Sequence, residues 1–200
     1  MSTSKNLEAF KNYPLHVELK GRTYQIRQMQ ASDGEAIMRF ASNLPPHDLL
    51  YMRRDITTET GVNRWLSGVH EERIHSVIAE NSAGEMVGYS TIHQDDLEWT
   101  QHVADLRVTV ATTERGSGLG RLLIREAFNI ALSLDVRRVT ASMTTDQIAS
   151  RNLFQELGFK NEALLKDHVR DREGKLHDLL IMACDVETFL ATRQAYGVGN

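Results

Sequence analysis

The chain has 200 residues, of which 41% are hydrophobic and 25% are charged, a composition that fits one globular domain with a sizeable core. Its formal net charge of −4 supplies no basic field, so we expect neither nucleic acid nor a membrane surface as a partner. A single cysteine excludes an internal disulfide, and no apolar run reaches the ~18 residues of a membrane span. We therefore expect a soluble cytoplasmic protein with a polar N-terminal extension over 1–13 and a single domain over 14–200.

Apolar periodicity divides the chain into short strands and helices. In chain order we expect strands over 16–20 and 23–29, helices over 32–43, 48–54 and around 62–69, strands over 76–80, 86–93 and 102–110, a helix over 119–134, a strand over 138–143, a helix over 147–157, strands over 159–169 and 176–183, and a last helix over 185–196. Ser32 and Glu35 form the capping-box pattern that starts the first helix, and Pro45 and Pro46 stop it. Hairpins at both ends and helical crossovers between them predict an α/β (α+β) fold, with one mixed sheet and helices on both faces.

The most informative stretch lies where the strand over 102–110 leads into the helix over 119–134. Glycines at 116, 118 and 120 make the connecting loop, in which successive backbone N–H groups can turn toward one point without obstruction by Cβ atoms. The first turn of the helix adds unpaired N–H donors and the positive end of the helix dipole. This arrangement predicts a socket for a phosphate or pyrophosphate group.

Two common phosphate-binding motifs do not fit this loop. A nucleoside-triphosphatase P-loop needs Lys and then Ser or Thr after its last glycine, whereas Arg121 and Leu122 follow here. A dinucleotide-binding loop needs its third glycine one place later and an acidic residue at the end of the next strand, which here ends in Met-Thr-Thr. The loop therefore belongs to neither of these motifs, and glycine-rich turns before helices are also common as purely structural joints.

The loop resembles the acyl-CoA signature of the GNAT N-acetyltransferase superfamily, Arg/Gln-x-x-Gly-x-Gly/Ala, at Arg115, Gly118 and Gly120. Further along, residues 147–159 resemble the second signature of that superfamily, Asn-x-x-Ala-x-x-Leu-Tyr-x-x-x-Gly-Phe, with the final glycine and phenylalanine in register. Residues 105–108 also resemble the strand that leads into the loop, and the order of elements is similar to that of the GNAT fold.

The resemblance implies acetyl-CoA or another acyl-CoA as co-substrate, bound in a cleft between the strand ending at 110 and the strand beginning at 138. It assigns the backbone of Val108, Thr109 and Val110 to the pantetheine arm. It assigns six consecutive loop residues to the pyrophosphate: Gly116, Ser117, Gly118, Leu119, Gly120 and Arg121. Arg115 and Gln147 complete the expected cofactor site, although both arginines are also typical of solvated helix ends and Gln147 of a polar helix N-terminus. We expect no metal, because the eight histidines show no ligand spacing.

Amine acetylation requires a base near the thioester. A lysine-like amine has a pKa of about 10.4, so losing its proton at neutral pH costs about 4 kcal/mol without assistance. Asp105 is the first candidate, acting directly or through water, and His102 is the second. Strand alternation places these two on opposite faces, so both can reach the cleft only if a bulge intervenes.

The sequence departs from the family pattern at Phe154, which stands where the family has the tyrosine that protonates the departing sulfur. A thiol of pKa about 8.5 is a fair leaving group as thiolate, so this change predicts slower chemistry, another donor or unassisted departure. For the acceptor pocket we expect polar and aromatic residues from 44–69 and near Trp99: Arg53, Arg54, Asp55, Trp65, Glu72, Trp99 and His102.

Three functions stay open at this point. The first is an acyl-CoA-dependent N-acyltransferase, acting on a primary amine of a small molecule or protein. The second is a non-catalytic acyl-CoA-binding sensor, favoured by Phe154, and the third is an interaction protein that keeps only the fold. The sequence leaves the acceptor, the acyl chain length and a homodimer undecided.

Overall fold

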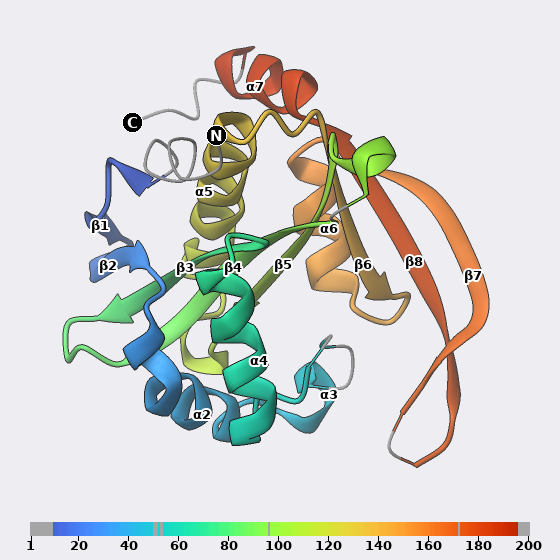
Figure 1. Ribbon diagram of the computed structural model, residues 1–200. Helices are drawn as coiled ribbons and strands as arrows, with labels where there is room; N and C mark the ends of the chain where they lie inside the picture. Colours follow the sequence, from blue (N-terminus) through green and yellow to red (C-terminus); the bar gives the residue numbers. More distant parts are fainter. Residues whose placement is uncertain (1–9, 50–51, 53, 96, 172, 196–200) are drawn as a thin grey trace.

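The computed structural model describes residues 10–49, 52, 54–95, 97–171 and 173–195, and Figure 1 gives the element labels used below. The strands are β1 Leu15–Leu19, β2 Arg22–Gln28, β3 Ile74–Asn81, β4 Met86–Gln94, β5 Val103–Val110, β6 Arg138–Thr144, β7 Lys160–Arg170 and β8 Leu176–Asp185. The α-helices are α2 Gly34–Ser42, α3 Pro46–Leu49, α4 Glu59–His70, α5 Leu119–Ser133, α6 Ile148–Glu156 and α7 Val186–Ala195. Short 3₁₀ turns are η1 Ala31–Asp33, η2 Glu98–Thr100 and η3 Thr112–Glu114.

The strands form one 8-stranded sheet in the order β1-β2-β3-β4-β5-β6-β8-β7. All neighbouring pairs are antiparallel except β5 and β6, which run parallel because α5 carries the chain back between them. The expected mixed sheet is confirmed, and the strand boundaries lie within two residues of those predicted from the sequence.

Helices cover both faces of the sheet, as predicted. On one face, α2 and α4 pack against β3 and β4 around a buried cluster that includes Ile37, Phe40, Trp65 and Tyr89. On the other face, α5, α6 and α7 pack around Phe128, which stacks on Phe189 with ring centroids 3.8 Å apart. Each layer buries the apolar stripe of its helices, and the two cores fix the position of β5 at the centre of the sheet (Figure 1).

The chain enters α2 differently from the sequence prediction. The N-cap of α2 is Asp33, not Ser32, and its carboxylate caps the preceding turn η1 by accepting the Gln30 N–H at 2.6 Å. The same carboxylate binds the Arg27 guanidinium at 2.8 and 2.9 Å. Arg27 also binds Glu80 at 2.6 Å, and this long-range pairing outweighs the local Ser-x-x-Glu pattern.

The helix predicted over 48–54 begins earlier in the structure. Helix α3 starts at Pro46, because proline's fixed φ and missing N–H suit the first turn of a helix. Residues 50, 51 and 53 lie outside the described residues, as do 196 and 197, where the last helix was predicted to end.

Gly61, in the first turn of α4, has no room for a side chain. An added Cβ would lie 1.9 Å from the Asp55 carbonyl oxygen, so Gly61→Ala must displace backbone. We expect this variant to lose about 3 kcal/mol of unfolding free energy in urea denaturation. Gly34→Ala is the matched control, because its Cβ would meet only Leu66 and Val62 side chains at 3.8 Å. Equal stability of the two variants would contradict this packing argument.

Candidate functional site

Strands β5 and β6 separate part of the way along the sheet. The pairs between them are Val103 with Arg138, Ala104 with Val139, and Asp105 with Thr140, where the described pairing ends. Beyond that point β5 stays paired with β4 as far as Val110. The edge of β5 that faces β6 is therefore open from residue 106 onward.

Two hydrogen bonds fix which backbone groups of β5 face this opening. The Ala111 N–H donates to the Val87 carbonyl at 2.8 Å, toward β4, while the Ala104 carbonyl accepts from Thr140 Oγ1 at 3.3 Å, toward β6. Because backbone direction alternates along a strand, the N–H and C=O groups of 106, 108 and 110 point into the opening. They offer an extended ligand the hydrogen bonds that a neighbouring strand would make.

The glycine loop lies at the end of this open edge. Gly116 and Gly118 have φ values of +76° and +97°, which side chains rarely allow, and an added Cβ at either position would meet open space. Gly118 is the N-cap of α5, and the Leu122 N–H is bonded back to its carbonyl at 3.1 Å. N–H groups in this first turn are thus available to an anion at the loop, as the sequence predicts.

Side chains from the first hairpin hold this loop in place. The Glu114 carboxylate accepts hydrogen bonds from the Tyr24 hydroxyl at 2.5 Å and from Arg22 at 2.7 Å, and these contacts lower the pKa of Glu114. The Lys20 ammonium donates to the Gly116 carbonyl at 2.7 Å. Sequence reasoning missed this clamp because its partners are about 90 residues apart and carry no local pattern.

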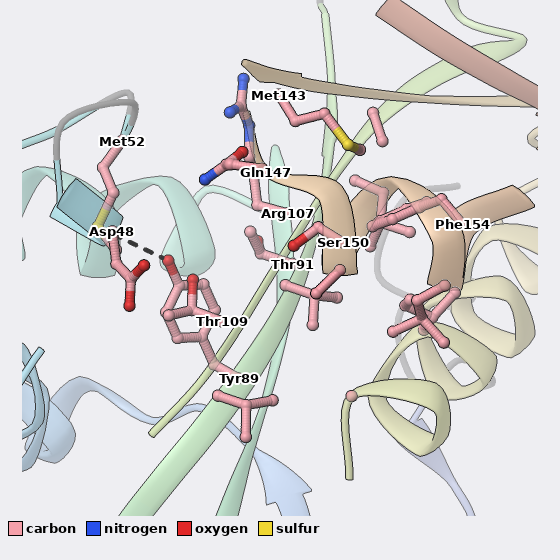
Figure 2. A pocket seen from close by; sticks show the side chains of 18 of the residues that line it. Asp48, Met52, Tyr89, Thr91, Arg107, Thr109, Met143, Gln147, Ser150 and Phe154 are labelled. Carbon is pink, nitrogen blue, oxygen red and sulfur yellow. Dashed lines mark hydrogen bonds between the residues drawn. The ribbon is translucent and has the colours of Figure 1, made fainter. Parts of the chain in front are cut away.

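A cavity of about 860 Å³ passes through the opening between β5 and β6. Its lining includes the glycine loop, the open part of β5, the start of α6 and the segment from α3 to α4. Figure 2 shows Asp48 and Met52 on one side of the cavity, Gln147, Ser150 and Phe154 of α6 on the other, and the side chains of β4 and β5 between them. This size and lining suit an extended cofactor together with a small second substrate.

Cross-strand pairs from β4 and β5 build the cavity wall that faces α2 and α4. The register places His93 opposite Asp105, Thr91 opposite Arg107, and Tyr89 opposite Thr109, and all of these residues line the cavity. Arg107 Nε donates to Asp105 at 2.9 Å, and burial raises the pKa of Tyr89. Four of the six, Tyr89, Thr91, His93 and Arg107, were not singled out from the sequence, although alternation along paired strands is the signal that identifies them.

The expected cofactor residues divide into two groups. The cavity lining contains Val108, Thr109, Val110, Arg115, Gly116, Gly118, Gly120, Arg121 and Gln147. The side chains of Ser117 and Leu119 instead point into the protein: Ser117 Oγ accepts the Leu119 N–H at 3.1 Å, and Leu119 lies in the core. The two arginines have carboxylate partners, since Arg115 pairs with Asp48 of α3 and Arg121 with Glu156 of α6.

The two candidate bases lie in different surroundings. Asp105 lines the cavity where β5 and β6 separate. His102 is exposed, precedes β5, and is outside the cavity lining; its carbonyl accepts the N–H groups of Arg137 and Arg138 at 2.9 and 3.0 Å. The structure therefore brings Asp105, but not His102, to the place where the two strands part.

The expected acceptor residues are also separated. Arg54 and Trp65 line the cavity, whereas Asp55, Glu72 and Trp99 do not, and Trp99 is 75% exposed on the turn before β5. Arg53 lies outside the described residues. Phe154 lines the cavity with its ring packed against Phe159 at a centroid distance of 4.8 Å.

The described residues were also compared with the requirements of a metal site and of a membrane span. Among the described residues, no group of three or more His, Cys, Asp or Glu side chains is placed to hold a metal ion. Nor does any described helix combine the length and apolar composition needed to cross a bilayer.

Comparison with known proteins identifies the family. Residues 38–159 match the acetyltransferase (GNAT) family. Over 160 residues the chain is 24% identical to "Putative phosphinothricin acetyltransferase YwnH" of Bacillus subtilis (strain 168), covering 78% of this chain and 96% of that protein. The structure of a ribosomal-protein-alanine N-acetyltransferase from Brucella melitensis superposes with a TM-score of 0.71 at 26% identity, covering 80% of this chain and 98% of that one.

A second solved structure has the same fold at lower identity. It is the structure of yncA, described as a putative acetyltransferase, from Salmonella typhimurium with its cofactor acetyl-CoA. The TM-score is 0.70 at 20% identity, covering 82% of this chain and 94% of that one. The family match spans well over half of the sequence and takes in the open edge of β5, the glycine loop and the start of α6. The chain belongs to the acetyltransferase (GNAT) family.

Proposed function

We propose that this protein is an N-acetyltransferase that moves the acetyl group of acetyl-CoA to a primary amine by direct attack of the amine on the thioester. The observation that carries the proposal is the open edge of β5, which leads from the parting of β5 and β6 to the glycine loop. The acetyl-CoA complex of the Salmonella typhimurium protein, which has the same fold, supports the choice of co-substrate. We also propose a cytoplasmic enzyme whose residues 14–200 act as one domain.

The residues present fit an acyl-CoA. Backbone groups of 108 and 110 are directed into the opening and can pair with the amides of a pantetheine arm. A pyrophosphate would find open space at Gly116 and Gly118, where no Cβ atoms intrude. The N–H donors of the first turn of α5 can bind its oxygens. Arg115 and Arg121 are about half exposed, with side-chain exposures of 51% and 40%, so a phosphate can compete for them with their present carboxylate partners.

Asp105 is the residue that we propose for proton removal from the amine. It stands at the point where the strands part, which is where the reactive end of an extended ligand lying along β5 would be. Its carboxylate can attract the ammonium form and accept the proton directly or through water, while Arg107 Nε fixes its orientation. A bound acyl-CoA supplies an activated thioester, whose thiol has a pKa of about 8.5.

Phe154 lines the cavity but has no hydroxyl that could protonate the departing sulfur. Departure of CoA therefore relies on the acidity of its thiol or on another proton donor. The same observation favours one second function, a non-catalytic domain that binds acyl-CoA and senses it. Turnover separates the two functions, because a sensor binds acetyl-CoA without consuming it.

The test is amine-dependent release of free CoA thiol from acetyl-CoA, followed by mass analysis of the amine. We expect thiol release that depends on both the protein and an amine, with one acetyl group added to the amine. Binding of acetyl-CoA without thiol release across a broad amine panel would favour the sensor, and absence of both would remove the proposal.

A further inference from the structure

A hydrogen-bonded chain of three side chains leads from the core beneath α4 to the wall of the cavity. Trp65 Nε1 of α4 donates to Ser76 Oγ of β3 at 3.1 Å, and Ser76 Oγ bonds Thr91 Oγ1 of β4 at 2.8 Å. The three side chains are buried, with exposures of 4% for Trp65, 0% for Ser76 and 8% for Thr91. Of these three residues, Thr91 and Trp65 border the cavity, whereas Ser76 does not. Figure 2 shows Thr91 among the residues at the centre of the cavity.

The direction of each proton in this chain follows from its chemistry. An indole N–H can only donate, so Ser76 Oγ must be the acceptor in the first bond. The proton of the Ser76 hydroxyl then needs an acceptor of its own, because a buried unpaired donor is costly. Among the described residues, Thr91 Oγ1 is the remaining partner of that hydroxyl, so Ser76 donates and Thr91 accepts. The proton of Thr91 is left to point toward the cavity.

The neighbour of Thr91 on β5 is also a donor. Arg107 stands directly across from Thr91, and a guanidinium carries N–H groups but no acceptor. One step along the same face is Asp105, which can only accept when ionised. Backbone positions two residues apart on one strand are about 7 Å from each other, and the Arg107 side chain spans that spacing, since its Nε donates to Asp105 at 2.9 Å. The wall therefore presents donors at one level and an acceptor for an ammonium group at the next.

We propose that the Thr91 hydroxyl is a pre-oriented hydrogen-bond donor to the acceptor substrate, and that the enzyme selects small amines carrying a carbonyl or carboxylate oxygen close to the nitrogen. The proposal rests on the N-acetyltransferase function proposed above. An oxygen lone pair satisfies the Thr91 proton while the amine lies at Asp105. A simple alkylamine brings no lone pair to Thr91 other than the one that must attack the thioester, so it leaves the donor unpaired.

Matched pairs of substrates test this selection. L-phenylalanine and phenethylamine, and L-tryptophan and tryptamine, differ within each pair by the carboxylate beside the amine, and neither control amine carries another accessible lone pair. We expect kcat/KM to be at least about tenfold higher for one or more of the amino acids than for the amine of the same pair. An amide of the preferred amino acid distinguishes a carbonyl from a carboxylate requirement.

Variants at Thr91 and Trp65 assign the preference to this hydroxyl. Thr91→Val, which keeps the shape but removes the donor, should bring the ratio within the preferred pair close to one, mainly by raising KM for the amino acid. Thr91→Ser should keep the ratio. Trp65→Phe removes the donor that sets the direction of the chain, so it should weaken the ratio although the Thr91 hydroxyl is still present. The KM for acetyl-CoA should not change, which controls for a disturbed fold.

The outcomes separate failure of this inference from failure of the proposed function. Efficient acetylation of the oxygen-free amines by the wild-type protein, or an unchanged ratio in Thr91→Val, would overturn the inference and leave the acetyltransferase in place. Binding of acetyl-CoA with acetylation of no pair member would overturn the inference for these small amines. Failure to bind acetyl-CoA would remove the proposed function itself.

Discussion

Gly120→Glu is expected to weaken acetyl-CoA binding by at least about 100-fold, which corresponds to about 2.7 kcal/mol. An added Cβ at this position would lie 3.5 Å from Leu153 and 3.7 Å from Val110, both of which line the cavity. The longer side chain must therefore extend into the space that the cofactor needs. It would also place a carboxylate beside the N–H donors of the first turn of α5, where it repels phosphate.

Gly120→Ala is the matched control, because contacts of 3.5 and 3.7 Å are ordinary van der Waals distances. It should keep acetyl-CoA affinity within a few-fold of wild type, and isothermal titration calorimetry would measure both. Gly118→Glu should lose binding as well, with an added cost in folding because of its φ of +97°. Wild-type affinity in both glutamate variants would exclude the loop as the pyrophosphate site.

Asp105→Asn is expected to lower kcat by about 100-fold or more while leaving acetyl-CoA affinity nearly unchanged. The amide oxygen of asparagine can still accept the hydrogen bond that Arg107 Nε makes at 2.9 Å, so the side chain should keep its place. What is lost is the negative charge and the basicity that the ammonium group of the acceptor requires.

Steady-state turnover at saturating acetyl-CoA, with calorimetric measurement of cofactor binding, would test this expectation. His102→Gln provides the comparison, since His102 lies outside the cavity lining. If His102→Gln loses the turnover and Asp105→Asn retains it, the base has been assigned to the wrong residue.

The central part of the site could be predicted from the sequence because the patterns that specify it are local. A β-branched strand, three glycines and an amphipathic helix follow one another without interruption between Val103 and Ser133. Strand, positive-φ turn and helix N-terminus each depend on residues only a few positions apart. The mixed sheet also follows from local signals, since hairpins lie toward both ends of the chain and helices α5 and α6 form crossovers between them.

The acceptor side was harder to predict because it is built by pairing between strands and by long-range contacts. Thr91 and Arg107 become neighbours only through the register of β4 and β5, which no single stretch of sequence specifies. Trp65 was expected at the acceptor site as an aromatic residue of the segment 44–69, but its bond to Ser76 depends on how α4 lies on β3. Asp48 meets Arg115 across the cavity from a four-residue helix whose start was misplaced by two positions.

Thermal unfolding with and without acetyl-CoA tests the central claim most directly, because a ligand that binds only the native state raises its stability by RT ln(1 + [L]/Kd). At a concentration 100 times Kd the gain is about 2.7 kcal/mol, which corresponds to a rise in Tm of about 5 °C or more for a chain of this size. We expect such a shift with acetyl-CoA and with free CoA for the wild-type protein and Gly120→Ala, and none for Gly120→Glu. The same Tm for the wild-type protein with and without either CoA compound would contradict the assignment of the cavity.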